Sequence, residues 1–352
     1  MTIFRRIGRG VPSALGAAAL FGASTPVAKA LLGAVSPWLL AGLLYLGSGV
    51  GLAIVLGVRR WRGAAGGAKL QPADWPWLLV TIVAGGIAGP VLLMLGLAAT
   101  EASTAALLLN LESVFALAIA WRVFHEYVDR RIGLGAAAVV AGGAVLSWGG
   151  PVGFDWANLW IVGACFAWAI DDNLTRKISG ADPLRITAIK GLVAGGVNVG
   201  LALALGGGWP PPGAAAIAGI VGFLGYGVSL SLFVVALREL GAARTMAYFS
   251  TAPFVGAALA IVGFGEPVTP AFLAAAVLMA AGVALHLTER HQHEHVHEPM
   301  EHEHWHWHDE HHQHAHAPGD PPGEPHSHRH VHARLVHSHP HYPDIHHRHS
   351  HG

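Results

Sequence analysis

The chain has 352 residues, of which 53% are hydrophobic and 12% are charged, and its formal net charge is zero. Soluble domains carry about 25% charged residues, so this composition excludes a soluble globular protein and predicts a polytopic membrane protein. The balanced charge implies no nucleic-acid partner, and the single cysteine, Cys165, excludes an internal disulfide and a thiolate metal site.

Ten apolar segments follow a short basic N-terminus, residues 1–10. Each is close to the ~20 residues that a bilayer requires. We therefore predict an all-α integral membrane protein with ten transmembrane helices. The predicted spans are residues 11–32, 37–58, 75–98, 102–121, 132–149, 157–177, 183–205, 214–237, 242–264 and 270–287. Gly89-Pro90 and Pro253 fall inside spans and should bend them, because proline has no backbone N–H.

The segment 102–146 recurs 140 residues later in the chain. An internal repeat of this kind sets the architecture, so it is considered before the individual residues. The matches in one ungapped register are Glu126 with Glu266, Val128 with Val268, and Gly142 with Gly282.

The second span of each half supports the same repeat. Ser36-Pro37 and Asp182-Pro183 each combine a capping side chain with proline at the first helical position. We therefore predict two five-helix repeats, residues 11–149 and 157–288, joined by a periplasmic linker, residues 150–156. Because five is an odd number, the two repeats insert with opposite orientation.

Lysine and arginine occupy alternate loops, and positively charged loops remain in the cytoplasm. The opposite loops contain Glu101, Asp155 and Glu266 but no lysine or arginine. This alternation predicts a cell (inner) membrane protein whose N- and C-termini are both cytoplasmic.

An ionisable side chain at mid-bilayer costs roughly 2.5 to 3.5 kcal/mol, so it is a functional candidate by default. Glu112 lies about halfway along the fourth span. One reading is that Glu112 binds a cationic group or carries a proton; the other is a structural carboxylic acid hydrogen-bonded to a neighbouring helix. The residues expected to line a substrate cavity between the halves are Asn110, Glu112, Ser113, Tyr248, Ser250 and Thr251.

A second polar group lies near the cytoplasmic ends of the sixth and seventh spans. Asp171, Asp172 and Asn173 precede one end, and Lys190 follows the other, each about 10 Å inside the boundary at ~1.5 Å per residue. An ion pair of Lys190 with either aspartate would be a gate or coupling element, or a static pair that makes insertion tolerable. Lys29, near the outer end of the first span, is either a ligand or a snorkelling side chain.

The last segment, residues 289–352, contains 23 of the 25 histidines and has no apolar periodicity. It cannot bury a core, so we predict a cytoplasmic tail that is disordered without a ligand. Neutral imidazole binds Zn, Ni, Co and Cu well, although such a tract also binds metals adventitiously and charges just below neutral pH. The expected metal ligands are His302, His304, His306, His308, His311, His312, His346, His347 and His349.

Several of these features together resemble the EamA-like branch of the drug/metabolite transporter superfamily, over about residues 15–285. They are Glu126, its partner in Gly265-Glu266, Ser113 in ESVFA, Pro253 in TAPFV, and the helices AAAVVAGGAVL and AAAVLMAAGVAL. The family often has proline where this chain has Ser113, and its pattern does not include the histidine-rich tail. The resemblance implies a central cavity and alternating access by an inverted-repeat bundle, but no particular substrate.

The favoured function is a secondary transporter, exporting small organic metabolites or drugs. In the alternative function, the fold is the same but Ni, Co or Zn is the transported ion or the regulator, and the tail is a metal buffer or sensor. A metal buffer that does not transport is disfavoured, because ten spans with polar residues inside are more than a membrane anchor needs. No phosphate loop or nucleophile–base pattern supports an enzyme. The expected partners are the lipid bilayer, a small-molecule substrate and, in the alternative, divalent metal ions; a homodimer is left open. Transport requires no cofactor.

Overall fold

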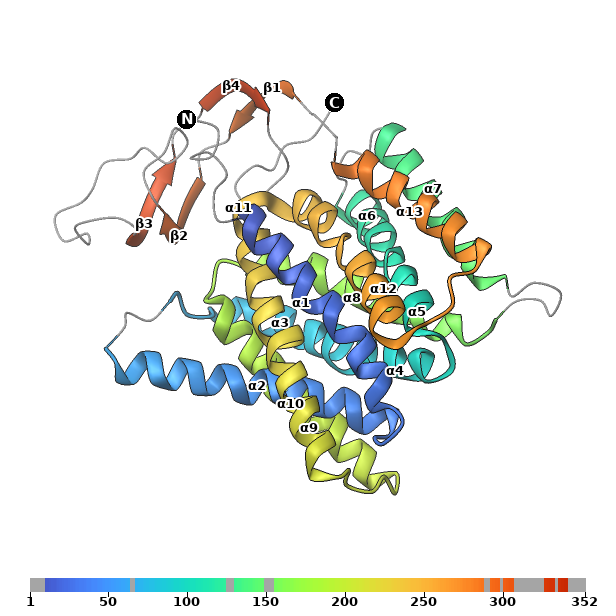
Figure 1. Ribbon diagram of the computed structural model, residues 1–352. Coiled ribbons are helices and arrows are strands. Elements are labelled where there is room, and N and C mark those ends of the chain that lie inside the picture. The colour runs from blue at the N-terminus through green and yellow to red at the C-terminus, as the bar shows by residue number, and fades with distance from the viewer. Residues whose placement is uncertain are drawn as a thin grey trace.

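A computed structural model of the chain describes residues 10–63, 67–124, 130–148 and 155–287, together with four short strands of the tail. The predicted all-α bundle of two repeats is confirmed (Figure 1). The first repeat contains α1 (Gly10–Leu31), α2 (Pro37–Trp61), the 3₁₀ turn η1 (Pro72–Asp74), α3 (Trp75–Thr81), the π-helical η2 (Ile82–Ala88), α4 (Gly89–Ala99), α5 (Ala102–Leu108), α6 (Leu111–Phe124) and α7 (Arg130–Ser147). The second contains α8 (Asn158–Ile178), α9 (Pro183–Ala204), α10 (Pro212–Val221), the π-helical η4 (Gly222–Val228), α11 (Ser229–Phe249), α12 (Ala252–Phe264) and α13 (Pro270–Leu287).

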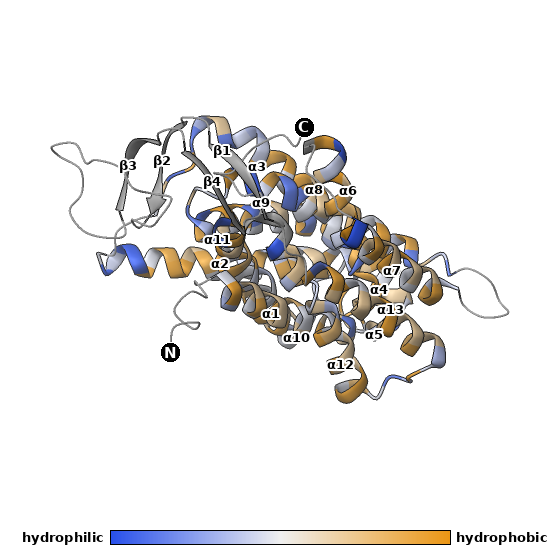
Figure 2. Ribbon diagram, turned by 90° about the horizontal axis from the view of Figure 1, so that it is seen from above, coloured by the Kyte–Doolittle hydropathy of each residue, from blue (hydrophilic) through white to orange (hydrophobic). Residues whose placement is uncertain are grey.

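The helices are hydrophobic along most of their length (Figure 2), and many large apolar side chains lie exposed on the bundle. Val262 is 85% exposed and Val277 is 68% exposed, which water would penalise and lipid does not. Within the described residues, nine spans are long and apolar enough to cross a membrane. The tenth predicted span is α8, a 21-residue helix whose Asp171, Asp172, Arg176 and Lys177 make it too polar for that criterion.

Packing between the repeats follows their internal symmetry. Helix α1 packs on α11 and α12, and its counterpart α8 packs on α4 and α6, the equivalent segments of the first repeat. Two further contacts join a helix to its own counterpart, α2 to α9 and α7 to α13. Figure 1 shows these two pairs on opposite sides of the bundle. The repeats are therefore interlocked along their length, and the core lies between them.

The α2–α9 contact is a seam of glycines that brings two backbones together. A Cβ atom added to Gly191 would lie 2.5 Å from the backbone nitrogen of Gly49 and 2.7 Å from its Cα atom. Gly42 and Gly195 make equally close backbone contacts along the same seam. In lipid the hydrophobic effect does not drive helices together, because the lipid tails are as apolar as the helices. Close packing of small residues stabilises helix pairs instead.

Replacing Gly191 with valine is expected to unfold or strongly destabilise the bundle, because the blocking atoms are backbone and cannot rotate away. Overpacking costs typically 1–3 kcal/mol even where side chains can yield. The measurement is the thermal unfolding temperature of the purified full chain in detergent. Gly196→Val on the same helix is the matched control, since a Cβ there meets nothing within 4 Å. Equal unfolding temperatures for the two variants would contradict the account.

Two spans in each repeat depart from regular α-helix at equivalent depths. The π segments η2 and η4 are 140 residues apart, the spacing of the sequence repeat. The fourth span breaks at residues 109–110 and the ninth at residues 250–251. The predicted bend at Pro253 is confirmed, and that at Gly89-Pro90 takes the form of the π segment just before it. In the first repeat, the break has no proline; instead the Ser113 hydroxyl donates to the carbonyl of Asn110 at 2.7 Å, which competes with helical bonding.

Glu266 ties the two repeats together at the start of α5. Its carboxylate accepts hydrogen bonds from the backbone N–H groups of Ala102 (2.8 Å) and Ser103 (2.7 Å), which a helix start leaves unsatisfied. Partial burial raises the pKa of Glu266, but the hydrogen bonds from Ser103 and Ala102 outweigh burial, and the net pKa is lowered.

A lowered folded pKa means that this contact stabilises the fold above the ordinary carboxyl pKa of ~4.3 and is lost as the pH falls through the folded value. We expect Glu266→Gln to destabilise the chain by about 1 kcal/mol at pH 7, as loss of a helix cap does. Thermal unfolding at pH 7 and towards pH 3 should show the difference from wild type shrinking. Asp155→Asn, which removes an exposed carboxylate before α8, is the control. A loss of stability in Glu266→Gln that is as large at pH 3 as at pH 7 would contradict this role of the carboxylate.

The tail contains two antiparallel strand pairs: β1 (Gln292–His297) with β4 (Leu335–Pro340), and β2 (Met300–His306) with β3 (His326–His332). The remaining tail residues lie outside the described ones, so disorder of the tail without a ligand stays a prediction. The His-x-His pattern has a period of two, which is that of an extended strand. The register places His302 opposite His330, and His304 opposite His328.

Candidate substrate cavity

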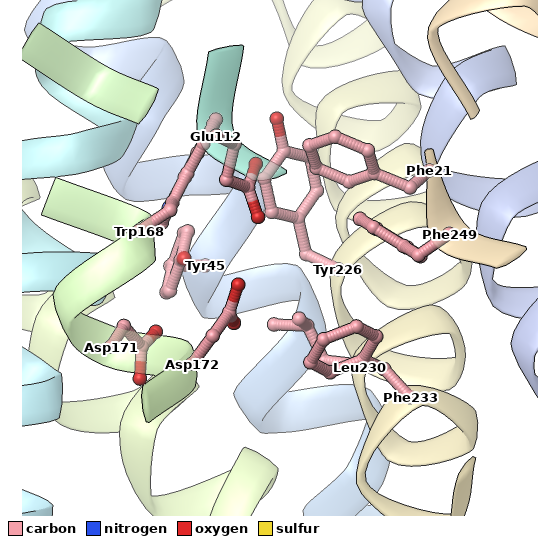
Figure 3. A pocket seen from close by; sticks show the side chains of 10 residues that line it. All are labelled: Phe21, Tyr45, Glu112, Trp168, Asp171, Asp172, Tyr226, Leu230, Phe233 and Phe249. Carbon is pink, nitrogen blue, oxygen red and sulfur yellow. The ribbon is translucent and has the colours of Figure 1, made fainter. Parts of the chain in front are cut away.

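A cavity with an empty volume of about 370 Å³ lies between the two repeats (Figure 3). Helices α1, α2 and α6 of the first repeat and α8, η4 and α11 of the second supply its walls. The lining residues are Phe21, Tyr45, Glu112, Trp168, Asp171, Asp172, Tyr226, Leu230, Phe233 and Phe249.

One wall is fixed to the π segment η2. There, the N–H of Gly89 donates to the carbonyl of Ala84, five residues back, so the carbonyl of Gly85 would need a donor from residue 90. That residue is Pro90, which has none. The free carbonyl of Gly85 instead accepts the Tyr45 hydroxyl at 2.6 Å and the Trp168 indole N–H at 2.9 Å. A backbone irregularity thus orients two aromatic side chains of the cavity, as π-bulges at functional sites often do.

The aromatic side chains form a connected cluster around Phe21. The ring centroid of Phe21 lies 5.7 Å from that of Trp168 and 5.6 Å from that of Tyr226, both edge to face. Tyr226 continues the chain to Tyr45 at 5.5 Å, and Phe249 lies 5.5 Å from Phe21. Such contacts between rings hold the rings in defined orientations. The cavity therefore has a preformed aromatic wall.

The carboxylates of the cavity have unequal partners. Asp171 is 4% exposed and accepts two hydrogen bonds from the Lys190 ammonium, at 2.5 and 2.7 Å, and one from the Thr175 hydroxyl at 2.8 Å. Of the two pairings that the sequence allows for Lys190, the structure forms the one with Asp171. A buried charge needs such a partner to be tolerated.

Glu112 and Asp172 are different. Both side chains line the cavity, and their carboxyl groups point towards each other in Figure 3. Glu112 is 6% exposed, and Asp172 Oδ2 is buried and receives no hydrogen bond. Two carboxylates this close cannot both remain ionised in a dry site unless a proton or a cation lies between them.

The residues predicted for the cavity are divided among several places. Glu112 lines the main cavity, and it also lines a smaller adjoining one of about 250 Å³ with Ser113 and Ser250. Neither lining includes Asn110, Tyr248 or Thr251. Asn110 donates to the carbonyl of Leu107, and Thr251 donates to that of Tyr248, so their polar groups serve the helix breaks.

The predicted gate residues also have distinct positions. Asp171 and Asp172 line the cavity, and Lys190 lies behind Asp171. Asn173 donates to the carbonyls of Ala116 and Ala169, which joins α8 to α6. Lys29 donates to the carbonyls of Leu97 (2.8 Å) and Thr100 (2.9 Å) and so caps the C-terminus of α4.

The sequence interpretation missed the aromatic lining. Phe21, Trp168, Phe233 and Phe249 are apolar residues in apolar spans, and nothing in their spacing separates a cavity-facing ring from one that packs in a helix contact. Tyr45 and Tyr226 did carry a signal, because a phenol hydroxyl deep in a span requires a partner.

Metal ligands are scarce in the bundle. Among the residues whose side chains the structure describes, no group of three or more histidine, cysteine, aspartate or glutamate residues is placed to hold a metal ion. The histidines proposed as ligands lie in the tail. Of these, His302, His304 and His306 fall in β2, and the others lie outside the described residues.

The comparisons with known proteins agree with the fold. The model of the EamA-like transporter family matches residues 8–148 and 155–288, once for each repeat. An "uncharacterized transporter" of Methanothermobacter thermautotrophicus is 26% identical over 291 residues, covering 78% of this chain and 84% of the relative. A solved structure described as "Crystal structure of protein" superposes with a TM-score of 0.62 at 19% identity, covering 80% of this chain and 99% of the other.

Proposed function

Because the chain belongs to the EamA-like transporter family, we propose that it is a secondary-active transporter that exports small organic metabolites or drugs by alternating access. The observation that carries this proposal is the cavity between the repeats, lined by side chains from both. Transporters built from inverted repeats bind their substrate at such an interface, near the bilayer midplane. Relative movement of the repeats would open this cavity to one side and then to the other.

The test compares metabolites in cells that overexpress the chain with those in deletion cells. We expect a small set of organic solutes to be depleted inside overexpressing cells and enriched outside. Leu230→Trp, which fills the cavity, should abolish the difference. Leu224→Trp, at a position 42% exposed on the bundle surface, is the matched control and should retain it. Equal export by both variants would refute transport through this cavity.

The proposed orientation places both termini in the cytoplasm of the inner membrane. It is supported by the alternation of basic loops and by the even number of spans. Reporter fusions after Leu287 and before Gly10 should report the same compartment. Reports from opposite compartments would refute the orientation and the even number of spans.

We propose a separate metal-binding role for the tail, as a buffer or sensor. It is supported by the backbone register of β2 and β3, which pairs His302 with His330, His304 with His328, and His306 with His326. Imidazole is a common ligand of Zn and Ni. Truncation after Glu289 should abolish Zn and Ni binding in equilibrium dialysis, and metal resistance should fall if cells use the tail. Unchanged binding would exclude this role.

A further inference from the structure

We propose that the cavity selects an organic cation with an apolar, ring-sized body, and that the Glu112–Asp172 pair exchanges this cation for a proton. The inference rests on the proposed function and deepens it, because it assigns the chemical class of the substrate and of the coupling ion. It starts from the charges that face the cavity.

The cavity has unbalanced negative charge. Lys190 pairs with Asp171 and also acts electrostatically on Asp172, so among the described residues one ammonium group serves three buried carboxyl groups, with Glu112 the third. The remaining titratable groups that act on the pair are Tyr45 from α2 and Cys165 from α8; Cys165 is buried and donates to the carbonyl of Leu108. Neither supplies a positive charge, so an anionic ligand would be repelled.

The nearby basic side chains are also engaged elsewhere. Arg238 of α11 donates to the carbonyls of Ser179 and Ala181, and Lys29 caps α4. Lys190 is held by both oxygens of Asp171. A zwitterion would therefore find a partner for its ammonium group but none for its carboxylate. The charge arrangement favours a plain cation over a zwitterion of similar size.

The aromatic wall reinforces that preference. The faces of Trp, Tyr and Phe rings carry negative charge and attract cations, most strongly where water is excluded. Six aromatic residues line the cavity, and Tyr45 and Trp168 are held in place by Gly85. A metal ion would gain little here, since hard cations require six or more oxygen ligands and the two free carboxyl groups supply few. An organic cation uses both the rings and the carboxylates.

The two facing carboxyl groups allow a cation to be exchanged for a proton. In the empty cavity Glu112 and Asp172 share one proton, which relieves their repulsion. A bound cation relieves the same repulsion, so its entry releases the shared proton to water. When the cation leaves on the other side, a proton returns to the pair. Each cycle moves one monovalent cation against one proton, and charge balances. A proton gradient directed into the cell would then drive export.

The test is calorimetric titration of the purified full chain with three ligands of one body and different charge. They are benzyltrimethylammonium, phenylalanine and 3-phenylpropionate. Titration in two buffers of different protonation enthalpy gives the number of protons released per ligand. We expect the cation to bind at least roughly 30-fold more tightly than the others, the factor that a buried charge contact provides. About one proton should be released for each cation bound.

The variants Glu112→Gln and Asp172→Asn should each lose the proton release and weaken cation binding, while Asp155→Asn should behave as wild type. Equal binding of the zwitterion or the anion, cation binding without proton release, or failure of benzyltrimethylammonium to bind would each overturn the inference. Export of a neutral or anionic solute that Leu230→Trp blocks would overturn it and leave the proposed function standing. Loss of the proposed function shows separately, as export that Leu230→Trp does not change.

Discussion

Glutamine in place of Glu112 is expected to abolish proton-driven accumulation of a monovalent organic cation in proteoliposomes. One-for-one exchange lets a difference of one pH unit, about 1.4 kcal/mol, sustain about a tenfold concentration ratio. With Glu112→Gln the remaining Asp172 has no second carboxyl group with which to share a proton, so the ratio should fall to about one. The measurement is cation uptake together with the decay of an imposed pH gradient.

The control for this experiment is Asp155→Asn, which removes a carboxylate outside the cavity and should accumulate the cation as wild type does. The same gradient should decay faster when cation is added to wild-type vesicles, and no faster when it is added to Glu112→Gln vesicles. Retained accumulation in the Glu112→Gln vesicles would exclude a coupling role for this residue and leave it as a structural acid.

The second large effect concerns the ion pair behind the cavity. Lys190→Met leaves Asp171 as an uncompensated buried charge, and loss of one partner of a buried pair costs about 3–5 kcal/mol. We expect the single variants Lys190→Met and Asp171→Asn to lower the thermal unfolding temperature sharply. The double variant should recover most of the loss, because no charge is then left unpaired.

Lys69→Met, at an exposed position before α3, is the control and should leave stability unchanged. Single variants as stable as wild type would contradict the buried pair. The double variant also separates the two readings of the pair. If its stability and export both return, the pair is static; if its stability returns but export does not, the pair has to open and close during transport.

Much of the bundle could be predicted from sequence because lipid imposes a simple rule on composition. Spans of about 20 apolar residues are dictated by the bilayer, and Pro37 and Pro183 begin α2 and α9 as predicted. Of the two predicted capping side chains, Asp182 accepts from the N–H of Leu184, but Ser36 makes no cap hydrogen bond. The exception is α8, whose charges make it look less like a span than its neighbours. Two of those charges, Asp171 and Asp172, line the cavity, and the packing that permits this is not visible in hydropathy.

The irregular backbone was only half predictable. Pro253 predicts the break in the ninth span, but the equivalent break in the fourth span has no proline and is accompanied by side-chain hydrogen bonds of Asn110 and Ser113 to nearby carbonyls. The π segment before Pro90 has a sequence cause, whereas η4 has no proline at its end. η4 packs against α1 and α2, and no residue within it predicts the π segment from sequence.

The candidate site was also only partly predictable from sequence. Glu112, Asp171, Asp172 and Lys190 were found from sequence because each pays a large desolvation cost and must have a reason to be there. Which aspartate pairs with Lys190 was left open, since both lie within reach of it along the helices. The aromatic wall was missed because rings cost nothing in lipid, so their position in a span carries no information.

The counterpart contacts between the repeats have a consequence for the state that the structure does not display. In a fold of two like halves, the inward- and outward-open forms differ by a swap of conformation between the halves. Such a swap preserves the α2–α9 and α7–α13 contacts, because each of these pairs consists of a helix and its own counterpart. It changes the neighbours of α1 and α8, because α1 then packs as α8 does now and α8 packs as α1 does now. Threading each half onto the shape of the other therefore yields a template for the opposite form, with distances between α1 and α12 that spin-label spectroscopy can measure.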